Sequence, residues 1–97
     1  MSPTPEPDAY PHTVSLLFDY ADERDARLVG DAVAVEVGEI DDDRSTATVR
    51  RASDTLHVDV RAHDLIALRA GVNTWIRLVE TAEDVCALAA ERRANGN

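Results

Sequence analysis

Histidine and cysteine, two side chains that commonly serve in catalysis and in metal sites, are few in this 97-residue sequence. They are the histidines His12, His57 and His63 and the single cysteine Cys86. A zinc site takes its ligands from Cys, His and carboxylate side chains at short, regular spacings. The three histidines lie at a strand start, on an exposed strand face and at a helix start, without that ligand pattern. The sequence therefore predicts no metal site.

Motifs for nucleotide binding and nucleophilic catalysis are also missing. Phosphate loops and dinucleotide fingerprints need closely spaced glycines, whereas Gly30 and Gly71 each stand alone inside a predicted helix. Cys86 occupies a core position of the longest predicted helix, and nothing near it in the sequence would activate its thiol. We interpret Cys86 as a core side chain. We predict no catalytic residue and no cofactor, and we expect that the protein is not an enzyme.

The arginines are the remaining side chains with a chemical use. Arg50, Arg51 and Arg61 come from two predicted strands that pair, and two or more of them can share the open face of a sheet. Such a patch can contact phosphate groups. The alternative is that these arginines pair with acidic side chains, because surface charges usually pair or stay solvated. The candidate acids are Asp19, Asp54 and Asp59.

Acidic residues dominate the charge of the chain. Nineteen Asp and Glu residues face ten basic residues, all of them arginine, which gives a net charge of −9. This surface repels nucleic acid unless the arginines cluster. It suits molar salt, where the Debye length falls to about 3 Å and self-repulsion is screened. We interpret the composition as that of an extreme halophile, typical of an archaeon, and not as a sign of function.

The pattern along the chain indicates one α+β domain. Residues 1–11 carry all four prolines and are predicted to be a disordered tail, as are residues 94–97. The domain spans residues 12–93 and has too few residues for a second core. No apolar run approaches the roughly 20 residues that cross a bilayer, and the N-terminus lacks a signal-peptide pattern. We expect a soluble, cytoplasmic protein.

Alternation and helical spacing predict the order β-α-β-β-α. A strand starts at His12, and a helix follows from Asp22 to about Val37. Strands over 46–52 and 55–62 form a hairpin around Ser53-Asp54, and the long helix begins at His63-Asp64. A right-handed crossover places the third strand between the other two, with both helices on one face. Both edges of this three-stranded antiparallel-type sheet are then open, which favours completion by dimerisation.

The long helix has more apolar surface than one sheet can cover. At roughly 100° per residue, one apolar stripe is expected to pack on the sheet of the chain itself: Leu65, Leu68, Val72, Ile76, Val79 and Cys86. A second stripe is rich in small residues, and the first helix also has an excess stripe. We predict that these surplus positions, with the neighbouring Asn73 and Trp75, form a partner interface. The predicted interface is Leu28, Ala32, Val35, Ala67, Gly71, Asn73, Thr74, Trp75 and Leu78.

The start of the long helix and the strand before it resemble a known family. The tract DLIALRAGVNTWIR at Asp64–Arg77 follows the strand LHVDVRA at 56–62. Together they resemble the small dimerisation subunit of the KEOPS complex, the Pcc family. The most specific part is the pattern D-L-x-x-L-R-A-x-x-N at Asp64–Asn73. The resemblance spans roughly His12–Ala89, and the halophile-like composition agrees with an archaeal member.

This resemblance implies a non-catalytic role. Members of the family form homodimers and bind, through their helices, the catalytic subunit that transfers a threonylcarbamoyl group. Its target is the adenosine beside the anticodon of tRNAs that read ANN codons. The resemblance also implies support of tRNA binding, for which Arg50, Arg51 and Arg61 are the candidates, and a paralogous small subunit as a further partner. The alternative is a stand-alone dimeric α+β module that binds a small molecule between protomers.

Overall fold

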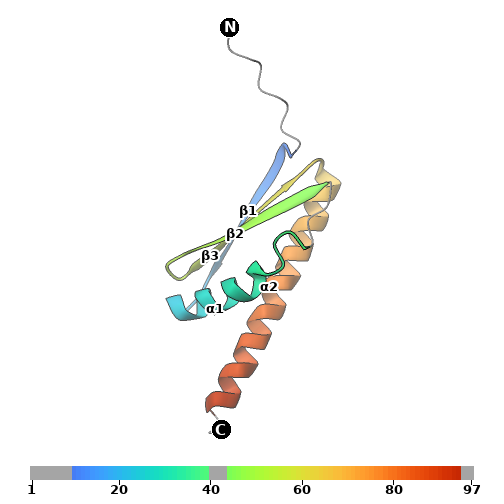
Figure 1. The fold of residues 1–97 in the computed structure, drawn as a ribbon. Coiled ribbons are helices and arrows are strands. Elements are labelled where there is room, and N and C mark those ends of the chain that lie inside the picture. Colours follow the sequence, from blue (N-terminus) through green and yellow to red (C-terminus); the bar gives the residue numbers. More distant parts are fainter. Residues whose placement is uncertain (1–9, 40–43, 95–97) are drawn as a thin grey trace.

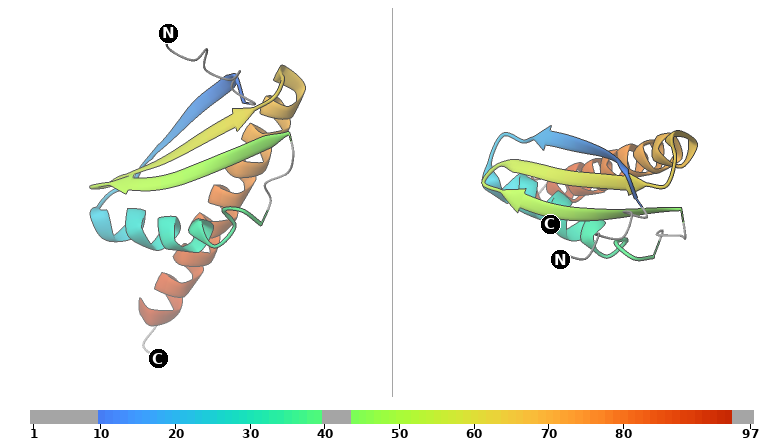
Figure 2. Two further views of the ribbon diagram at one scale, coloured as in Figure 1. Left: turned by 45° about the horizontal axis from the view of Figure 1, so that its top comes forward. Right: turned by 90° about the horizontal axis from the view of Figure 1, so that it is seen from above.

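The computed structural model describes residues 10–39 and 44–94 of the chain. The described elements follow the predicted order (Figure 1). They are β1 (His12–Asp19), α1 (Glu23–Ala34), β2 (Ser45–Ala52), β3 (Thr55–Ala62) and α2 (Leu65–Ala94). The antiparallel sheet has the strand order β1-β3-β2, and both helices cover one of its faces (Figure 2). The predicted α+β fold and its central third strand are confirmed. The predicted tails span residues 1–11 and 94–97. Residues 1–9 and 95–97 lie outside the described residues, and Ala94 is the last residue of α2.

The central strand β3 supplies most of the core that the sheet contributes. Its alternate side chains Leu56, Val58, Val60 and Ala62 are buried beneath the helices, because successive residues of a strand point to opposite faces. Each residue of β3 pairs with one residue of β1 and one residue of β2. Ala62, for example, lies opposite both His12 and Ser45. Within residues 10–39 and 44–94, no helix or strand lies over the opposite face of the sheet.

The first helix ends earlier than predicted. It begins after Asp22, whose Oδ1 accepts a hydrogen bond from the Asp25 N–H at 2.8 Å. It ends at Ala34, one turn before the predicted Val37. From there the chain continues through tight turns to Gly38, which has a φ of 86°. The valines in this segment have low helix propensity, and a left-handed φ suits glycine, so the helix stops early.

The side of α2 that faces the sheet differs from the predicted side. Trp75 is 2% exposed and Ala67 is buried. A Cβ added at Gly71 would lie 2.9 Å from Val60 Cγ1, so the helix backbone approaches β3 closely at this point. Leu65, expected against the sheet, is 67% exposed. The small size of Ala67 and Gly71 allows the helix backbone to approach β3 closely. The assignment of Ala67, Gly71 and Trp75 to a partner interface was therefore wrong.

The other members of the predicted sheet stripe lie at the margin of this contact. Leu68, Val72 and Cys86 are partly buried against the core, and Val79 is fully buried. Ile76 is partly buried. The buried stripe of α2 thus runs between the two predicted stripes and takes residues from both.

The second helix is much longer than the strands on which it packs. Its 30 residues span about 45 Å, whereas an eight-residue strand spans about 27 Å. Its C-terminal half therefore extends past the sheet (Figure 1). Within residues 10–39 and 44–94, none of the helices has the length and apolar character that crossing a membrane requires.

The start of α2 is fixed by one carboxylate. Asp64 Oδ1 accepts a hydrogen bond from the Ala67 N–H at 2.7 Å, which is an N-cap contact. Asp64 Oδ2 accepts a hydrogen bond from Arg44 Nη2 at 2.9 Å in an ion pair. The Ala67 N–H first, and then Arg44, hold the pKa of Asp64 below its ordinary value.

Replacing Trp75 with alanine tests the sheet-facing side of α2. Loss of a buried tryptophan costs about 3–5 kcal/mol of unfolding free energy, because a cavity remains in the core. Thr74→Ala on the exposed neighbouring position is the control, with an expected change within about 0.5 kcal/mol. Denaturant unfolding measures both. Equal effects of the two variants would contradict the orientation of α2.

The Asp64 cap predicts a dependence of stability on pH. A carboxyl group with a lowered pKa in the folded state stabilises the fold above its unfolded pKa, and this contribution disappears as pH falls through the folded pKa. Asp64→Asn preserves an acceptor for the Ala67 N–H but does not titrate. Lowering the pH from about 5 to about 3 should lower the Tm of the wild type more than that of Asp64→Asn. Thermal unfolding at a series of pH values measures both Tm values. Parallel Tm curves would show that Asp64 has no such role.

Candidate interaction surface

The side chains suited to chemistry lie apart from one another. His12 lies at the start of β1, His57 lies on the open face of β3, and His63 stacks at a tilt beside Tyr10 with ring centroids 5.9 Å apart. Cys86 is a free, partly buried thiol against the core. Across residues 10–39 and 44–94, no three His, Cys, Asp or Glu side chains are grouped so that they could hold a metal ion.

The three candidate arginines divide between the two faces of the sheet. Arg50 lies on the open face, where Nη2 is 3.4 Å from Nδ1 of His57. Arg61 shares that face, and its guanidinium lies 5.8 Å from the centroid of the Tyr10 ring. Arg51 lies on the helix side and pairs with Glu23 of α1 at 3.0 Å. The prediction that two of these arginines share the open face is confirmed, and Arg51 is not one of them.

The acids proposed as partners of these arginines have other hydrogen bonds. Asp59 Oδ1 accepts a hydrogen bond from Ser15 Oγ at 2.7 Å across the sheet. Asp19 Oδ1 accepts a hydrogen bond from Thr55 Oγ1 at 2.9 Å. Cross-strand pairs of this kind stabilise sheets. The open face is thus a polar surface with its own hydrogen bonds.

The surplus apolar stripe of α1 is exposed. Leu28, Ala32 and Val35 are all solvent-accessible, and Val35 is 68% exposed. The buried side of the same helix is formed by Ala26, Val29 and Val33. Because the sheet and α2 already cover that buried side, the Leu28 stripe has no cover within the described part of the chain.

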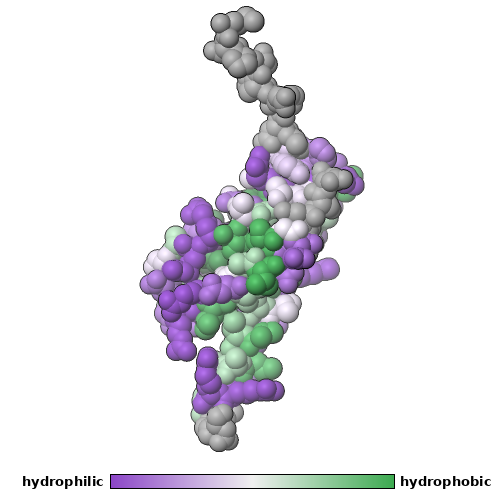
Figure 3. Space-filling model, in the orientation of Figure 1, coloured by the Kyte–Doolittle hydropathy of each residue, from purple (hydrophilic) through white to green (hydrophobic). Residues whose placement is uncertain are grey.

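The second helix exposes part of the predicted set together with residues outside it. Asn73 and Thr74 are exposed, and Leu78 is only partly buried. Beyond the sheet, Val85 is 61% exposed and Leu88 is also exposed. Figure 3 shows apolar surface that continues from the end of α1 down the projecting half of α2. Leu88 was missing from the predicted interface. The predicted long helix has far more residues than the predicted strands, and this difference is the signal that its C-terminal end would lack cover.

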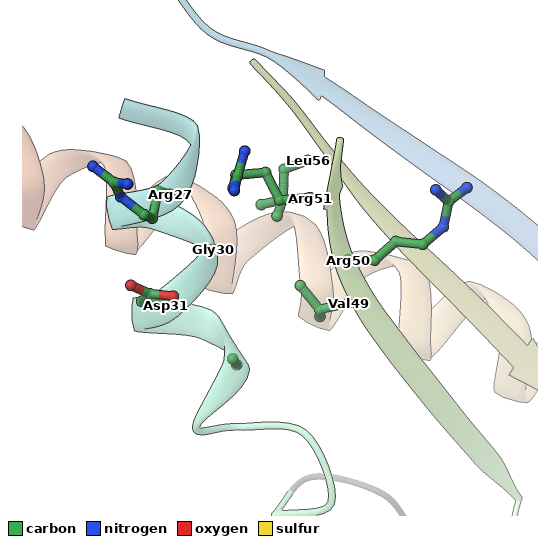
Figure 4. A pocket seen from close by; sticks show the side chains of 8 residues that line it. Arg27, Gly30, Asp31, Val49, Arg50, Arg51 and Leu56 are labelled. Atoms are coloured by element: carbon green, nitrogen blue, oxygen red, sulfur yellow. The ribbon is translucent and has the colours of Figure 1, made fainter. Parts of the chain in front are cut away.

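A shallow groove of about 140 Å³ lies between α1 and the edge strand β2 (Figure 4). Its apolar lining is Gly30, Ala34, Val49 and Leu56. Its polar lining is Arg27, Asp31, Arg50 and Arg51. In Figure 4 the side chain of Arg51 extends toward α1, whereas that of Arg50 points to the other side of β2. The groove therefore opens along the outer edge of the sheet. The sequence did not indicate it, because it forms between segments about 20 residues apart.

A polar contact joins Tyr20, the residue after β1, to α2. The Tyr20 hydroxyl donates a hydrogen bond to Glu83 Oε2 at 2.8 Å. Burial, and then the bond to Glu83, raise the pKa of Tyr20 well above its usual value. The hydroxyl thus remains a proton donor, and the contact lies where α2 leaves the sheet.

Comparisons with known proteins give one family and one fold. The profile of the family described as "Transcription factor Pcc1" matches residues 13–87. A chain in the crystal structure of the binary complex Gon7-Pcc1 aligns with a TM-score of 0.72 and 19% sequence identity. The alignment covers 82% of this chain and 98% of that chain. At this identity, the likeness shows a shared fold. The search of curated proteins finds no match.

Removal of the Tyr20 hydroxyl tests the polar contact to α2. Tyr20→Phe should lower the unfolding free energy by about 1 kcal/mol, because one hydrogen bond is lost and Glu83 loses its donor. Glu83→Gln preserves an acceptor and is the matched control with a smaller expected loss. Chemical unfolding at neutral pH distinguishes them. An unchanged stability of Tyr20→Phe would contradict this role.

Proposed function

This chain belongs to the Pcc1 family, and we propose that it is the non-catalytic dimerisation and scaffold subunit of a KEOPS complex. That complex forms threonylcarbamoyladenosine beside the anticodon of tRNAs that read ANN codons. The observation that carries the proposal is the family match over residues 13–87, which includes both helices and all three strands. Exposed apolar helix surface supports a role in assembly, since large apolar patches mark interaction sites.

The helices are the proposed contact with the catalytic transferase subunit. The proposed interface keeps those predicted positions that are accessible and adds the two exposed side chains of the projecting helix. It consists of Leu28, Ala32, Val35, Asn73, Thr74, Leu78, Val85 and Leu88. Apolar side chains on two neighbouring helices suit a partner that supplies helices to a mixed bundle.

The open face of the sheet is the proposed region for tRNA. Arg50 and Arg61 lie on this face, and arginines position phosphate groups. Arg51 is not included, because it pairs with Glu23 on the helix side. Self-association or pairing with a paralogous small subunit would present this face in two copies.

The cellular setting is also part of the proposal. We propose a salt-adapted cytoplasm of an archaeal host, which the net charge of −9 and the arginine-only basic residues support. In such salt, the short Debye length reduces repulsion within the acidic assembly.

Charged substitutions on the helices test the proposed contact with the catalytic subunit. Val85→Glu and Val35→Glu should each weaken binding of the catalytic subunit at least tenfold, because a carboxylate would be desolvated in the interface. Leu17→Glu is the matched control, since Leu17 is 60% exposed on the open sheet face. All three positions are exposed, so stability should change by less than about 0.5 kcal/mol. Calorimetry with the catalytic subunit of the same host measures the affinities. Equal affinity of all three variants and the wild type would overturn the assignment to the helices.

A further inference from the structure

The open face of the sheet carries less negative charge than the chain as a whole. Both helices cover the other face (Figure 2), so alternate residues of each strand point to the open side. The charged side chains that the three strands place there are two arginines and two aspartates: Arg50, Arg61, Asp19 and Asp59. Their formal charges cancel, whereas the whole chain carries −9. Long-range attraction for phosphate is therefore weak, and an RNA on this face must be held by short-range contacts.

Two aromatic rings and a guanidinium group meet at one end of this face. The rings of Tyr10 and His63 have centroids 5.9 Å apart and are tilted by 36°. The guanidinium of Arg61 lies 5.8 Å from the Tyr10 ring centroid. His63 is exposed and Tyr10 is half-buried, so both rings present surface to a flat ligand. Aromatic rings beside an arginine are the combination on which unpaired bases stack.

The second arginine of the open face lies toward the other end of the strands. Arg50 is paired with His57 in the register, and Arg50 Nη2 is 3.4 Å from His57 Nδ1. His57 and Arg61 are four residues apart on β3, which corresponds to about 13 Å along the strand. The bases of a duplex are paired and stacked within it, so they cannot lie against Tyr10. A single-stranded segment places a base on the rings while its backbone follows the face toward Arg50.

We propose that the rings of Tyr10 and His63 stack an unpaired base of RNA, and that Arg61 and Arg50 contact phosphate groups of the same single-stranded segment. This inference rests on the tRNA contact in the proposed function and specifies its form: an unpaired nucleotide held by stacking, in place of a duplex backbone held by charge. Stacking suits the salt-rich setting, because molar salt screens phosphate contacts. The burial of flat apolar ring surface does not depend on the phosphate charge.

Strands with and without bases separate stacking from phosphate contact. The probes are a fluorescein-labelled oligouridylate with one central adenine, the same strand annealed to its complement, and an abasic strand of equal length. At molar salt, the full chain should bind the single strand at least about fivefold more tightly than either of the others. Its log affinity should fall with log salt at a slope no steeper than about −1.4, from two phosphates at about −0.7 each. Fluorescence anisotropy measures these affinities.

Substitution of one ring tests the stacking site. Tyr10→Ala should weaken binding of the single strand at least about fivefold and leave binding of the abasic strand unchanged, because only the stacking contact is lost. Tyr10→Phe keeps the ring and should bind like the wild type. Leu88→Ala removes an exposed apolar side chain of the projecting helix and is the control.

A fluorescent base reports stacking independently of affinity. With 2-aminopurine in place of the adenine, binding to the wild type should quench the fluorescence of this base, whereas binding to Tyr10→Ala should not. Circular dichroism verifies that each variant is folded at the salt concentration used.

Three outcomes would overturn the stacking site. Equal affinities for the base-containing and abasic strands, or wild-type affinity and quenching in Tyr10→Ala, would exclude stacking while the phosphate contacts of the proposed function stand. Tighter binding of the duplex would show recognition of helical shape instead. A folded chain that binds none of the three probes at any salt concentration would overturn this inference together with the proposed tRNA region. The contact of the helices with the catalytic subunit is measured separately and does not depend on these results.

Discussion

The close packing of α2 on β3 is the contact on which the rest of the structure depends. At Gly71 the helix comes so near to Val60 that no Cβ fits without adjustment, and Trp75 on the next turn fills the core. Because β3 is the central strand, this contact fixes the helix against the middle of the sheet. The same contact decides which sides of both helices remain exposed.

The molecule has more apolar helix surface than its sheet can cover. The length of α2 leaves Val85 and Leu88 beyond the last strand residues, and α1 exposes the stripe that contains Leu28 and Val35. These side chains contribute little to the core of the chain itself. Their position on a helix layer that is packed on only one side is typical of a subunit whose surfaces are completed by other proteins. The proposed scaffold role uses this property.

The polar contacts differ between the helix side of the sheet and its open face. The ion pair Arg51–Glu23 connects β2 to α1. The ion pair Arg44–Asp64 connects the residue before β2 to the start of α2. Cross-strand hydrogen bonds occupy Asp59 and Asp19 on the open face. Arg27 and Asp31 differ from these groups, because they are exposed on α1 beside the groove to β2 and, within the described residues, neither forms an ion pair. The helix side of the sheet thus carries ion pairs, and the open face carries cross-strand hydrogen bonds.

The sequence by itself determined the element order, the central position of the third strand and the exposed stripe of α1. Those features follow from local periodicity and from connection rules that hold for any chain. It did not determine which of two apolar stripes on α2 packs on the sheet, because a helical wheel shows polarity but not how near two backbones approach. Residues such as Ala67 and Gly71 look like a partner-facing seam until β3 is placed against them. The division of Arg50 and Arg51 between faces, and the groove beside β2, likewise arise only when strand register and helix position combine in three dimensions.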